Sequence, residues 1–279
     1  MWNQRYIETK RGRFEIFEKG EGEPLAITHL YSEYDNRGNA FANPFTDYYH
    51  VYLINVRGAG NSVNAQSERE YSMDETVLDL ESIREALGID KWAFGGHSTG
   101  GMLGLKYAVF NEESLNKIIV SGAAASIHYN TDSKSIFCNL NPNFNRIREI
   151  MNLFNDLDLP VEERQKLSRE WALMSFYKAE NLAKAHEKPN SGKTVGARLD
   201  YFRKVDCHTF DVTEQLKQVT IPSFVSSGVY DAQCPYRFGV EIAELIPNAT
   251  FTAFEQSNHY PFWEEKLAFD EFVKLTLGS

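Results

Sequence analysis

Residues 94–101 read FGGHSTGG, a single serine within a run of four glycines. Residues 91–94, KWAF, are apolar enough for a buried strand, and residues 101–110, GMLGLKYAVF, for a buried helix. A tight turn from a strand into a helix needs neighbours without bulk, and Gly96 and Gly100 provide them. We therefore expect the turn to hold the hydroxyl of Ser98 in the open as a nucleophile, in preference to a purely structural glycine turn. His97 is expected to pack beside it.

Short apolar segments recur along the chain and alternate with helical ones. Residues 5–12 and 13–24 alternate in side-chain type on either side of a glycine and predict a hairpin at one edge of a sheet. Residues 73–88 carry apolar side chains three to four positions apart, which predicts a helix that packs on the sheet. The alternation predicts an α/β fold with a mostly parallel sheet flanked by helices. The further strands are expected at 25–30, 50–56, 91–96, 117–125, 221–229 and 249–256.

The interval 127–215 interrupts this rhythm, because it offers no good strand and reads instead as helical over residues 143–156 and 160–187. Pro160 suits the first turn of the second stretch. A helical insertion before the last two strands usually lies over the carboxyl edge of the sheet, where open α/β proteins bind ligands. We expect a core of residues 1–126 and 216–279 with a helical lid at 127–215, whose loop at 188–196 is mobile.

A serine hydroxyl needs a general base, and the base needs an acid that orients it. His259 follows the last expected strand and Asp231 follows the one before it, so both are expected at the carboxyl edge of the sheet opposite Ser98. The order serine, acid, histidine suits a nucleophile on such a turn. The alternative acids are Asp206 and Asp211, and the alternative histidines, in strand or lid contexts, are His29, His50, His128, His186 and His208.

With Ser98, Asp231 and His259 in this order, the chain resembles the α/β-hydrolase fold over almost its whole length outside the lid. Residues 55–62, NVRGAGNS, are similar to the loop after the fourth strand in that superfamily, residues 210–235 to the segment that leads into the acid, and residues 258–265, NHYPFWEE, to the histidine segment. The chain looks most like the proline iminopeptidase branch and its esterase relatives. That resemblance implies a serine enzyme that hydrolyses acyl bonds without a cofactor.

The chain departs from that branch at three places. The usual His-Gly-Gly-Pro-Gly after the third strand is here HLYSE, residues 29–33, so the backbone N–H of Leu30 is expected to serve with that of Thr99 as the oxyanion hole, and Tyr31 to crowd the entrance. Asn55 replaces the commoner aspartate. Asn258 replaces a glycine, a mild change because asparagine tolerates the left-handed conformation.

The substrate has to be predicted from the lid. Residues 127–219 hold 13 acidic and 14 basic residues, which excludes a generally acidic lid for cationic substrates. An aminopeptidase would need specific carboxylates for the ammonium group of its substrate. Candidates are Glu170, Glu180 and Asp200, and Trp171, Phe176, Tyr177, Tyr201 and Phe202 are the aromatic residues near them.

Composition excludes several classes of protein. The 279 residues are 42% hydrophobic and 24% charged, as in ordinary globular proteins, and the net charge of −10 argues against a nucleic-acid partner. No stretch is apolar enough for a membrane helix or a signal peptide, and the odd number of cysteines, three, fits a reducing compartment, so a cytoplasmic location is expected. No His, Cys and carboxylate cluster has the spacing of a metal site.

We therefore expect a hydrolase of small ester or amide substrates that needs no cofactor or metal, with a proline-iminopeptidase-like aminopeptidase as the leading subclass. A carboxylesterase or a carbon–carbon bond hydrolase could use the same residues. A ligand-binding protein with little turnover is the alternative of a different class. The oligomeric state and the exact substrate are not predicted.

Overall fold

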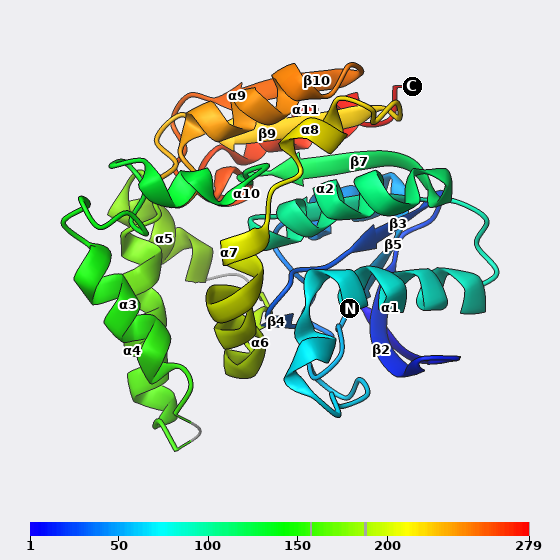
Figure 1. Ribbon diagram of the computed structural model, residues 1–279, viewed down its shortest axis with the longest axis horizontal. Helices are drawn as coiled ribbons and strands as arrows, with labels where there is room; N and C mark the ends of the chain where they lie inside the picture. The colour runs from blue at the N-terminus through cyan, green and yellow to red at the C-terminus, as the bar shows by residue number, and fades with distance from the viewer. Residues whose placement is uncertain (157, 187–188, 279) are drawn as a thin grey trace.

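An eight-stranded sheet runs through the middle of the computed structural model, which describes residues 1–156, 158–186 and 189–278 (Figure 1). The strands lie in the order β1-β2-β5-β3-β6-β7-β9-β10, and all neighbours from β5 to β10 are parallel, which confirms the mostly parallel sheet. The strands are β1 Asn3–Thr9, β2 Gly12–Lys19, β3 Glu23–Ile27, β5 Tyr49–Ile54, β6 Trp92–His97, β7 Leu115–Ser121, β9 Ser223–Gly228 and β10 Ala249–Phe254.

The antiparallel hairpin β1–β2 forms the expected edge of the sheet, and β2 pairs antiparallel with β5. Its turn passes through Gly12, whose φ of 128° is one that other residues rarely adopt. Each strand begins or ends within a few residues of the expected position. The reason is that apolar strands between turn residues are signalled locally in the sequence.

Helices cover both faces of the sheet. Along β7, Ile118 and Val120 pack with α1, α2 and α9, whereas Ile119 faces the opposite layer with Phe269 and Phe272 of α11. In Figure 1, α1 and α2 lie in front of the sheet. The helices of this part are α1 Met73–Ala86, α2 Thr99–Asn111, α8 Thr213–Leu216, α9 Tyr236–Leu245, α10 Pro261–Glu264 and α11 Lys266–Leu275.

The segment between β7 and β9 is mostly helical and lies at one end of the sheet (Figure 1). The single stretch expected at 160–187 is wrong in detail, because it forms two helices with a break at residues 174–178, and Pro160 precedes the first of them as its N-cap. At the break, Ser175 O accepts a hydrogen bond from His259 N at 3.1 Å and Tyr177 N donates to Glu264 at 2.6 Å. The helices are α3 Phe144–Leu153, α4 Val161–Leu173, α5 Ala179–His186, α6 Gly196–Tyr201 and α7 Cys207–Thr209, with a π-helical turn at Phe202–Asp206.

One short strand in this segment was not expected. β8, Lys193–Thr194, pairs antiparallel with β4, Ser32–Glu33, in a two-stranded sheet of its own. Its neighbour Ser191 is buried and donates a hydrogen bond to Gly38 O. Residues 189–196 of the loop expected at 188–196 are thus joined to the segment that follows β3, and Lys188 lies outside the described residues.

The described residues also bear on membrane insertion and on the cysteines. Every helix there is too short or too polar to cross a bilayer. The three cysteines, Cys138, Cys207 and Cys234, are buried and unpaired, as expected for inert thiols.

A buried carboxylate joins the helical segment to α1. Asp206 accepts a hydrogen bond from Met73 N, at the first turn of α1, at 3.1 Å. Burial raises the pKa of Asp206 to about 6. The pKa of an aspartate in the unfolded chain is about 3.9. Protonated Asp206 therefore stabilises the fold fully below about pH 4, and this contribution is lost as the pH rises through 6.

We predict that Asp206→Asn raises the free energy of unfolding at pH 8 by about 1–2 kcal/mol, because the amide oxygen can still accept from Met73 N and no charge is buried. At pH 4.5 the gain should largely disappear. Urea unfolding at the two pH values measures both. The control is Asp211→Asn, since hydrogen bonds from Thr213 lower the pKa of Asp211, and that variant should not gain stability. Equal effects of Asp206→Asn at both pH values would contradict this account.

Candidate active site

The turn between β6 and α2 has a strained and crowded backbone. Ser98 has φ 57° and ψ −125°, and among the described residues it is the one residue other than glycine with a positive φ. A Cβ on Gly96 would lie 2.1 Å from Gly100 O, and a Cβ on Gly100 would lie 2.3 Å from Thr28 O. Both positions therefore require glycine, as the sequence predicted. Such a backbone costs of order 1–3 kcal/mol and persists because the surrounding structure enforces it.

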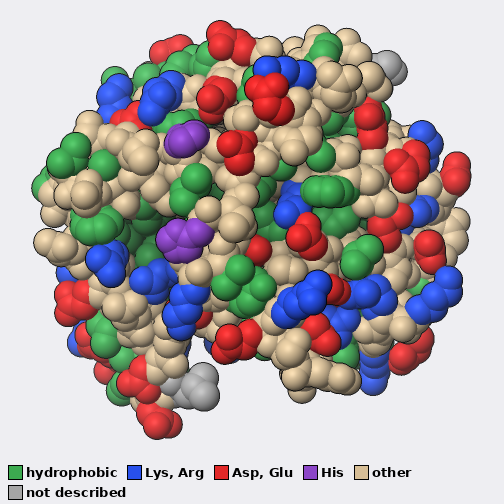
Figure 2. Space-filling view, in the orientation of Figure 1, with side chains coloured by type: hydrophobic (Ala, Val, Ile, Leu, Met, Phe, Trp, Pro, Cys, Tyr) green, Lys and Arg blue, Asp and Glu red, His purple; other side chains and the backbone are tan. Residues whose placement is uncertain are grey.

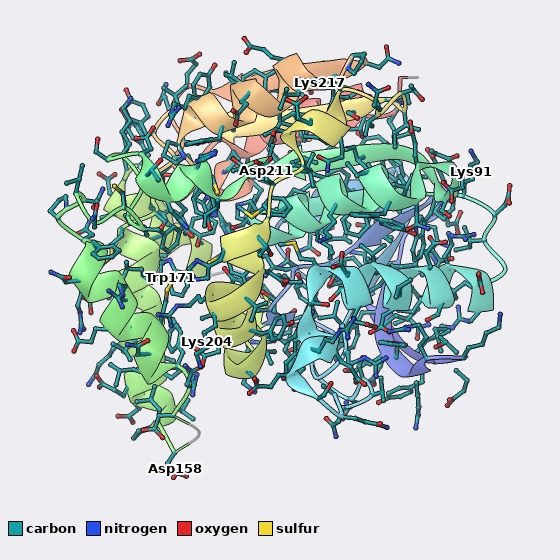
Figure 3. The ribbon with its side chains drawn as sticks, in the orientation of Figure 1. Lys91, Asp158, Trp171, Lys204, Asp211 and Lys217 are labelled. Atoms are coloured by element: carbon teal, nitrogen blue, oxygen red, sulfur yellow. The ribbon has the colours of Figure 1, made fainter. Side chains whose placement is uncertain are left out.

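Ser98 differs from expectation in its exposure. Its side chain was expected in the open, yet the residue is only 7% exposed. It instead lines two cavities, one of about 1460 Å³ and one of about 470 Å³. The reason is that residues of α4 and of the turn after α6, such as Trp171 and Lys204, complete the walls of these cavities (Figure 3).

His259 and Asp231 form a buried pair. The Nδ1 atom of His259 lies 3.0 and 2.9 Å from the two carboxylate oxygens of Asp231, and the two residues are 1% and 3% exposed. Asp231 Oδ1 also accepts from the backbone N–H groups of Gln233 and Cys234 at 2.8 and 2.9 Å. With Nδ1 donating to the carboxylate, the lone pair of the neutral ring is on Nε2. His259 and Ser98 line the same larger cavity.

The loop that carries His259 is held by its neighbours. His97 donates from Nε2 to His259 O at 2.7 Å, and burial, with the charge of His259 second, holds the pKa of His97 well below its usual value. Its ring packs 5.0 Å from that of Phe262. Asn258 accepts from Ala232 N at 2.8 Å, which joins the histidine loop to the acid loop. The interpretation of His97 as a packing residue agrees with these contacts.

The end of β7 packs against the pair as well. Gly122 has φ 57°, and a Cβ there would lie 3.2 Å from both Asp231 Oδ2 and His259 Nδ1. The alternative acids lie elsewhere: Asp206 caps α1, and Asp211 accepts from Thr213. Among the described residues the carboxylate hydrogen-bonded to His259 is that of Asp231.

Two backbone N–H groups are free near Ser98. Neither Leu30 N nor Thr99 N donates to another described residue, and Leu30 is fully buried. The carbonyl of Leu30 accepts from the buried guanidinium of Arg198, and Tyr31 O accepts from Val195 N at 2.8 Å. The turn after β3 is thus held in position from α6 and its N-terminal neighbour.

The side chains of this turn are also ordered. His29 lies 3.2 Å from Thr99 Oγ1 and 3.1 Å from Ser32 Oγ, and burial lowers its pKa to about 3, so the ring is neutral at pH 7. Burial also lowers the pKa of Arg198, to about 10, which leaves it charged at pH 7. A buried cation therefore holds the carbonyl group of Leu30 in this turn.

The substrate residues predicted from the sequence divide into two groups. Tyr31 lines both cavities, Trp171 the larger one and Asp200 the smaller one. Four others contribute to neither lining, because a helical pattern alone does not tell which face of an inserted helix turns inward. Glu170 pairs with Arg146 at 2.6 Å, Glu180 is exposed, Tyr177 stacks on Tyr230 with ring centroids 4.4 Å apart, and Tyr201 is half-buried on α6.

Some residues of the site were missed. Gln233 lines both cavities and donates to Ser175 Oγ at 2.9 Å, and its position two residues after Asp231 was the available signal. No sequence pattern pointed to a role for Arg198 or Arg203 in the site, because a lone arginine in a helical stretch is most often exposed to solvent. No group of three His, Cys, Asp or Glu residues among those described is arranged to hold a metal ion.

The profile of a family described as alpha/beta hydrolase fold matches residues 30–266. The chain belongs to the α/β-hydrolase family. The structure of an alpha/beta fold family hydrolase from Bacillus anthracis str. Sterne shares 60% identity with this α/β-hydrolase, with a TM-score of 0.96 and 99% of each chain covered.

More distant relatives of this α/β-hydrolase include two proline iminopeptidases. That of Saccharolobus solfataricus is 27% identical, over 80% of this chain and 76% of the relative, and that of Heyndrickxia coagulans is 25% identical, over 95% of both. An esterase from Exiguobacterium antarcticum has the same fold, with a TM-score of 0.74 at 19% identity, over 98% of this chain and 99% of that one.

We predict that Gly96→Ala lowers the free energy of unfolding by about 3 kcal/mol or more, because its Cβ would overlap the backbone at Gly100 and the turn would have to move. The matched control is Gly95→Ala in the same strand. Its Cβ would meet only side chains, the nearest atom 3.3 Å away on Ile27, so the loss should be about 1 kcal/mol or less. Urea unfolding compares the two variants. Similar losses at both positions would refute the steric account.

Proposed function

We propose that this α/β-hydrolase is a serine hydrolase that cleaves small ester or amide substrates through an acyl-enzyme. The observation that carries the proposal is that His259, which is hydrogen-bonded to the buried carboxylate of Asp231, lines the same cavity as Ser98 on its strained turn. Each part has a role in acyl transfer: a nucleophile, a base, and an acid that orients the base.

In this mechanism the hydroxyl oxygen of Ser98 attacks the substrate carbonyl while His259 Nε2 takes its proton. Asp231 holds the Nδ1 proton and stabilises the imidazolium that results. The free N–H groups of Leu30 and Thr99 donate hydrogen bonds to the negative oxygen of the tetrahedral intermediate. His259 then returns the proton to the leaving group, and water repeats the sequence to release the acid.

We further propose that residues 127–215 act as a lid on a core of residues 1–126 and 216–279. Support comes from the cavity walls, which combine residues of the core with residues of α3, α4, α6 and α7. Excluding water in this way strengthens the electrostatic interactions with the intermediate. The substrate is a small molecule or a short peptide, without a cofactor, and the cytoplasmic location expected from the sequence stays a prediction.

The aminopeptidase predicted from the sequence is the second candidate, and the iminopeptidase relatives favour it. The charges around Ser98 favour an esterase instead. Among the described residues, the two linings hold only the carboxylates of Asp200 and Glu162. Asp200 already accepts from Lys204 and Asn155 at 2.6 Å each, and Glu162 is exposed. Neither is a free, desolvated partner for an ammonium group.

We predict that Ser98→Ala abolishes both ester hydrolysis and labelling by a fluorophosphonate probe. Asp231→Asn and His259→Ala should each slow the labelling about 10³- to 10⁴-fold, without additivity in the double variant, because these residues act as one unit. Asp206→Asn is the matched control and should label at the wild-type rate. Rapid labelling of Ser98→Ala, or loss of labelling in Asp206→Asn alone, would refute the assignment.

The choice between esterase and aminopeptidase is tested with prolyl 2-naphthylamide, its N-acetyl derivative and 4-nitrophenyl butyrate. We expect the butyrate ester to be the fastest and acetylation of the amine to change kcat/KM by less than about threefold, since no free, desolvated carboxylate of the described residues lines either cavity. An aminopeptidase would lose about tenfold or more on acetylation, because a charge-assisted contact of about 1.5–3 kcal/mol is removed. That result would establish the second candidate.

A further inference from the structure

The smaller cavity is basic, although the protein as a whole has a net charge of −10. It begins at Ser98 and Thr99 and extends between α3, α6 and α7. Figure 2 shows Lys and Arg side chains gathered on the face of the molecule where these helices lie. Most of the lining is apolar, from residues that include Met102, Tyr129, Phe137, Met151, Leu199 and Phe202.

The charged residues of this lining do not balance. Arg148, Arg203 and Lys204 face the single carboxylate of Asp200, which leaves two positive charges in excess. Lys204 Nζ lies 2.6 Å from Asp200, whereas Arg203 lies 3.7 Å from it. Arg148 has no acidic partner within 4 Å among the described residues. A protein of net charge −10 therefore carries a local positive site beside its proposed nucleophile.

Of the two arginines, Arg203 is half-buried and Arg148 is exposed. The side chain of Arg203 is 22% exposed and donates to Asn152 at 3.0 Å. Its pKa is lowered, by burial first and then by the charge of Arg148. Two like charges in a partly buried site destabilise one another, and an anion between them removes that cost. A guanidinium also matches a carboxylate in geometry, with two parallel hydrogen bonds.

Two more polar atoms in the lining lack a partner. The buried amide oxygens of Asn130 and Asn155 make no hydrogen bond with any described residue. A buried polar atom without a partner costs free energy unless a ligand or water satisfies it. The cavity thus combines apolar walls, an excess of cationic groups and amide oxygens that can accept a hydrogen bond from a ligand or water.

We propose that this cavity binds a carboxylate, so that the preferred substrates are small esters or amides that carry a carboxylate group in addition to the bond that is cleaved. This inference rests on the proposed function and narrows it to a substrate class. The carboxylate lies on the arginine side, at Arg148 and Arg203, while the scissile carbonyl lies at Ser98. The apolar residues between them contact the carbon chain that joins the two groups.

The test compares esters that differ only in charge. One pair is 4-nitrophenyl hemiglutarate and its neutral methyl ester, with the carboxylate in the acyl part. The other is 4-carboxyphenyl butyrate and its methyl ester, with the carboxylate in the leaving group. In at least one pair we expect the anionic ester to have a kcat/KM about tenfold or more above the neutral one, and the pair that shows it identifies the side that enters the cavity. A ratio near one in both pairs would overturn the proposal.

Substitutions assign the effect to the arginines. Arg203→Gln and Arg148→Gln should each lower the ratio about fivefold or more, mainly through KM of the anionic ester, whereas Arg203→Lys should retain part of it. Arg146→Gln is the matched control, since Arg146 is on the same helix as Arg148 but pairs with Glu170 and Glu149, and it should leave both rates unchanged. An equal loss of the ratio in Arg146→Gln would overturn the proposal, and thermal unfolding verifies that each variant folds.

A binding measurement separates this inference from the proposed function. Calorimetry with glutarate on wild-type protein and on Ser98→Ala needs no turnover, and both should bind while Arg203→Gln binds at least about fivefold more weakly. Loss of fluorophosphonate labelling and of all ester hydrolysis, with glutarate binding intact, would reject the hydrolase and keep the carboxylate site. Hydrolysis of neutral esters without glutarate binding would reject the carboxylate site and keep the hydrolase.

Discussion

The close approach of three backbone segments at Ser98 is the constraint on which the rest of the site depends. Because Gly96 and Gly100 leave no room for a Cβ, the end of β6, the start of α2 and the turn after β3 come within contact of one another. That contact places the free N–H groups of Leu30 and Thr99 beside the serine. Without it, the left-handed backbone of Ser98 would have no support, and the positive φ would be lost.

The remaining groups are brought to this turn by different parts of the chain. The loops after β9 and β10 supply Asp231 and His259, and the helical segment between β7 and β9 positions both loops and the turn after β3 through hydrogen bonds at Ser175 and Arg198. The helical segment is therefore joined to the candidate site by these hydrogen bonds. It also changes the electrostatics, because α3 and the turn after α6 contribute arginine and lysine side chains to one cavity of an acidic protein.

The sequence predicted what is encoded locally. The glycines around Ser98, the strands that end before Asp231 and His259, and the order of elements follow from patterns a few residues long. Such patterns do not predict which face of an inserted helix turns toward the cavities, since this depends on how the segment packs on the sheet. For this reason Glu170 and Glu180 were expected at the substrate and lie outside the cavities, while the arginines that line one of them were missed. The pairing of β4 with β8 joins residues far apart in the sequence and has no local signal.

The order of the segments along the chain has a consequence for synthesis on the ribosome. The central strands β5, β3, β6 and β7, with the turn at Ser98, all precede the helical segment, so a nascent chain can build the strained turn early. β9 and β10 add to the sheet only afterwards, and His259 follows the last strand. In the proposed mechanism the serine therefore has no general base until β9 and β10 have joined the sheet and His259 has followed them. The proposed acyl-transfer reactivity would then depend on the last strands of the sheet, although the nucleophile lies on the central ones.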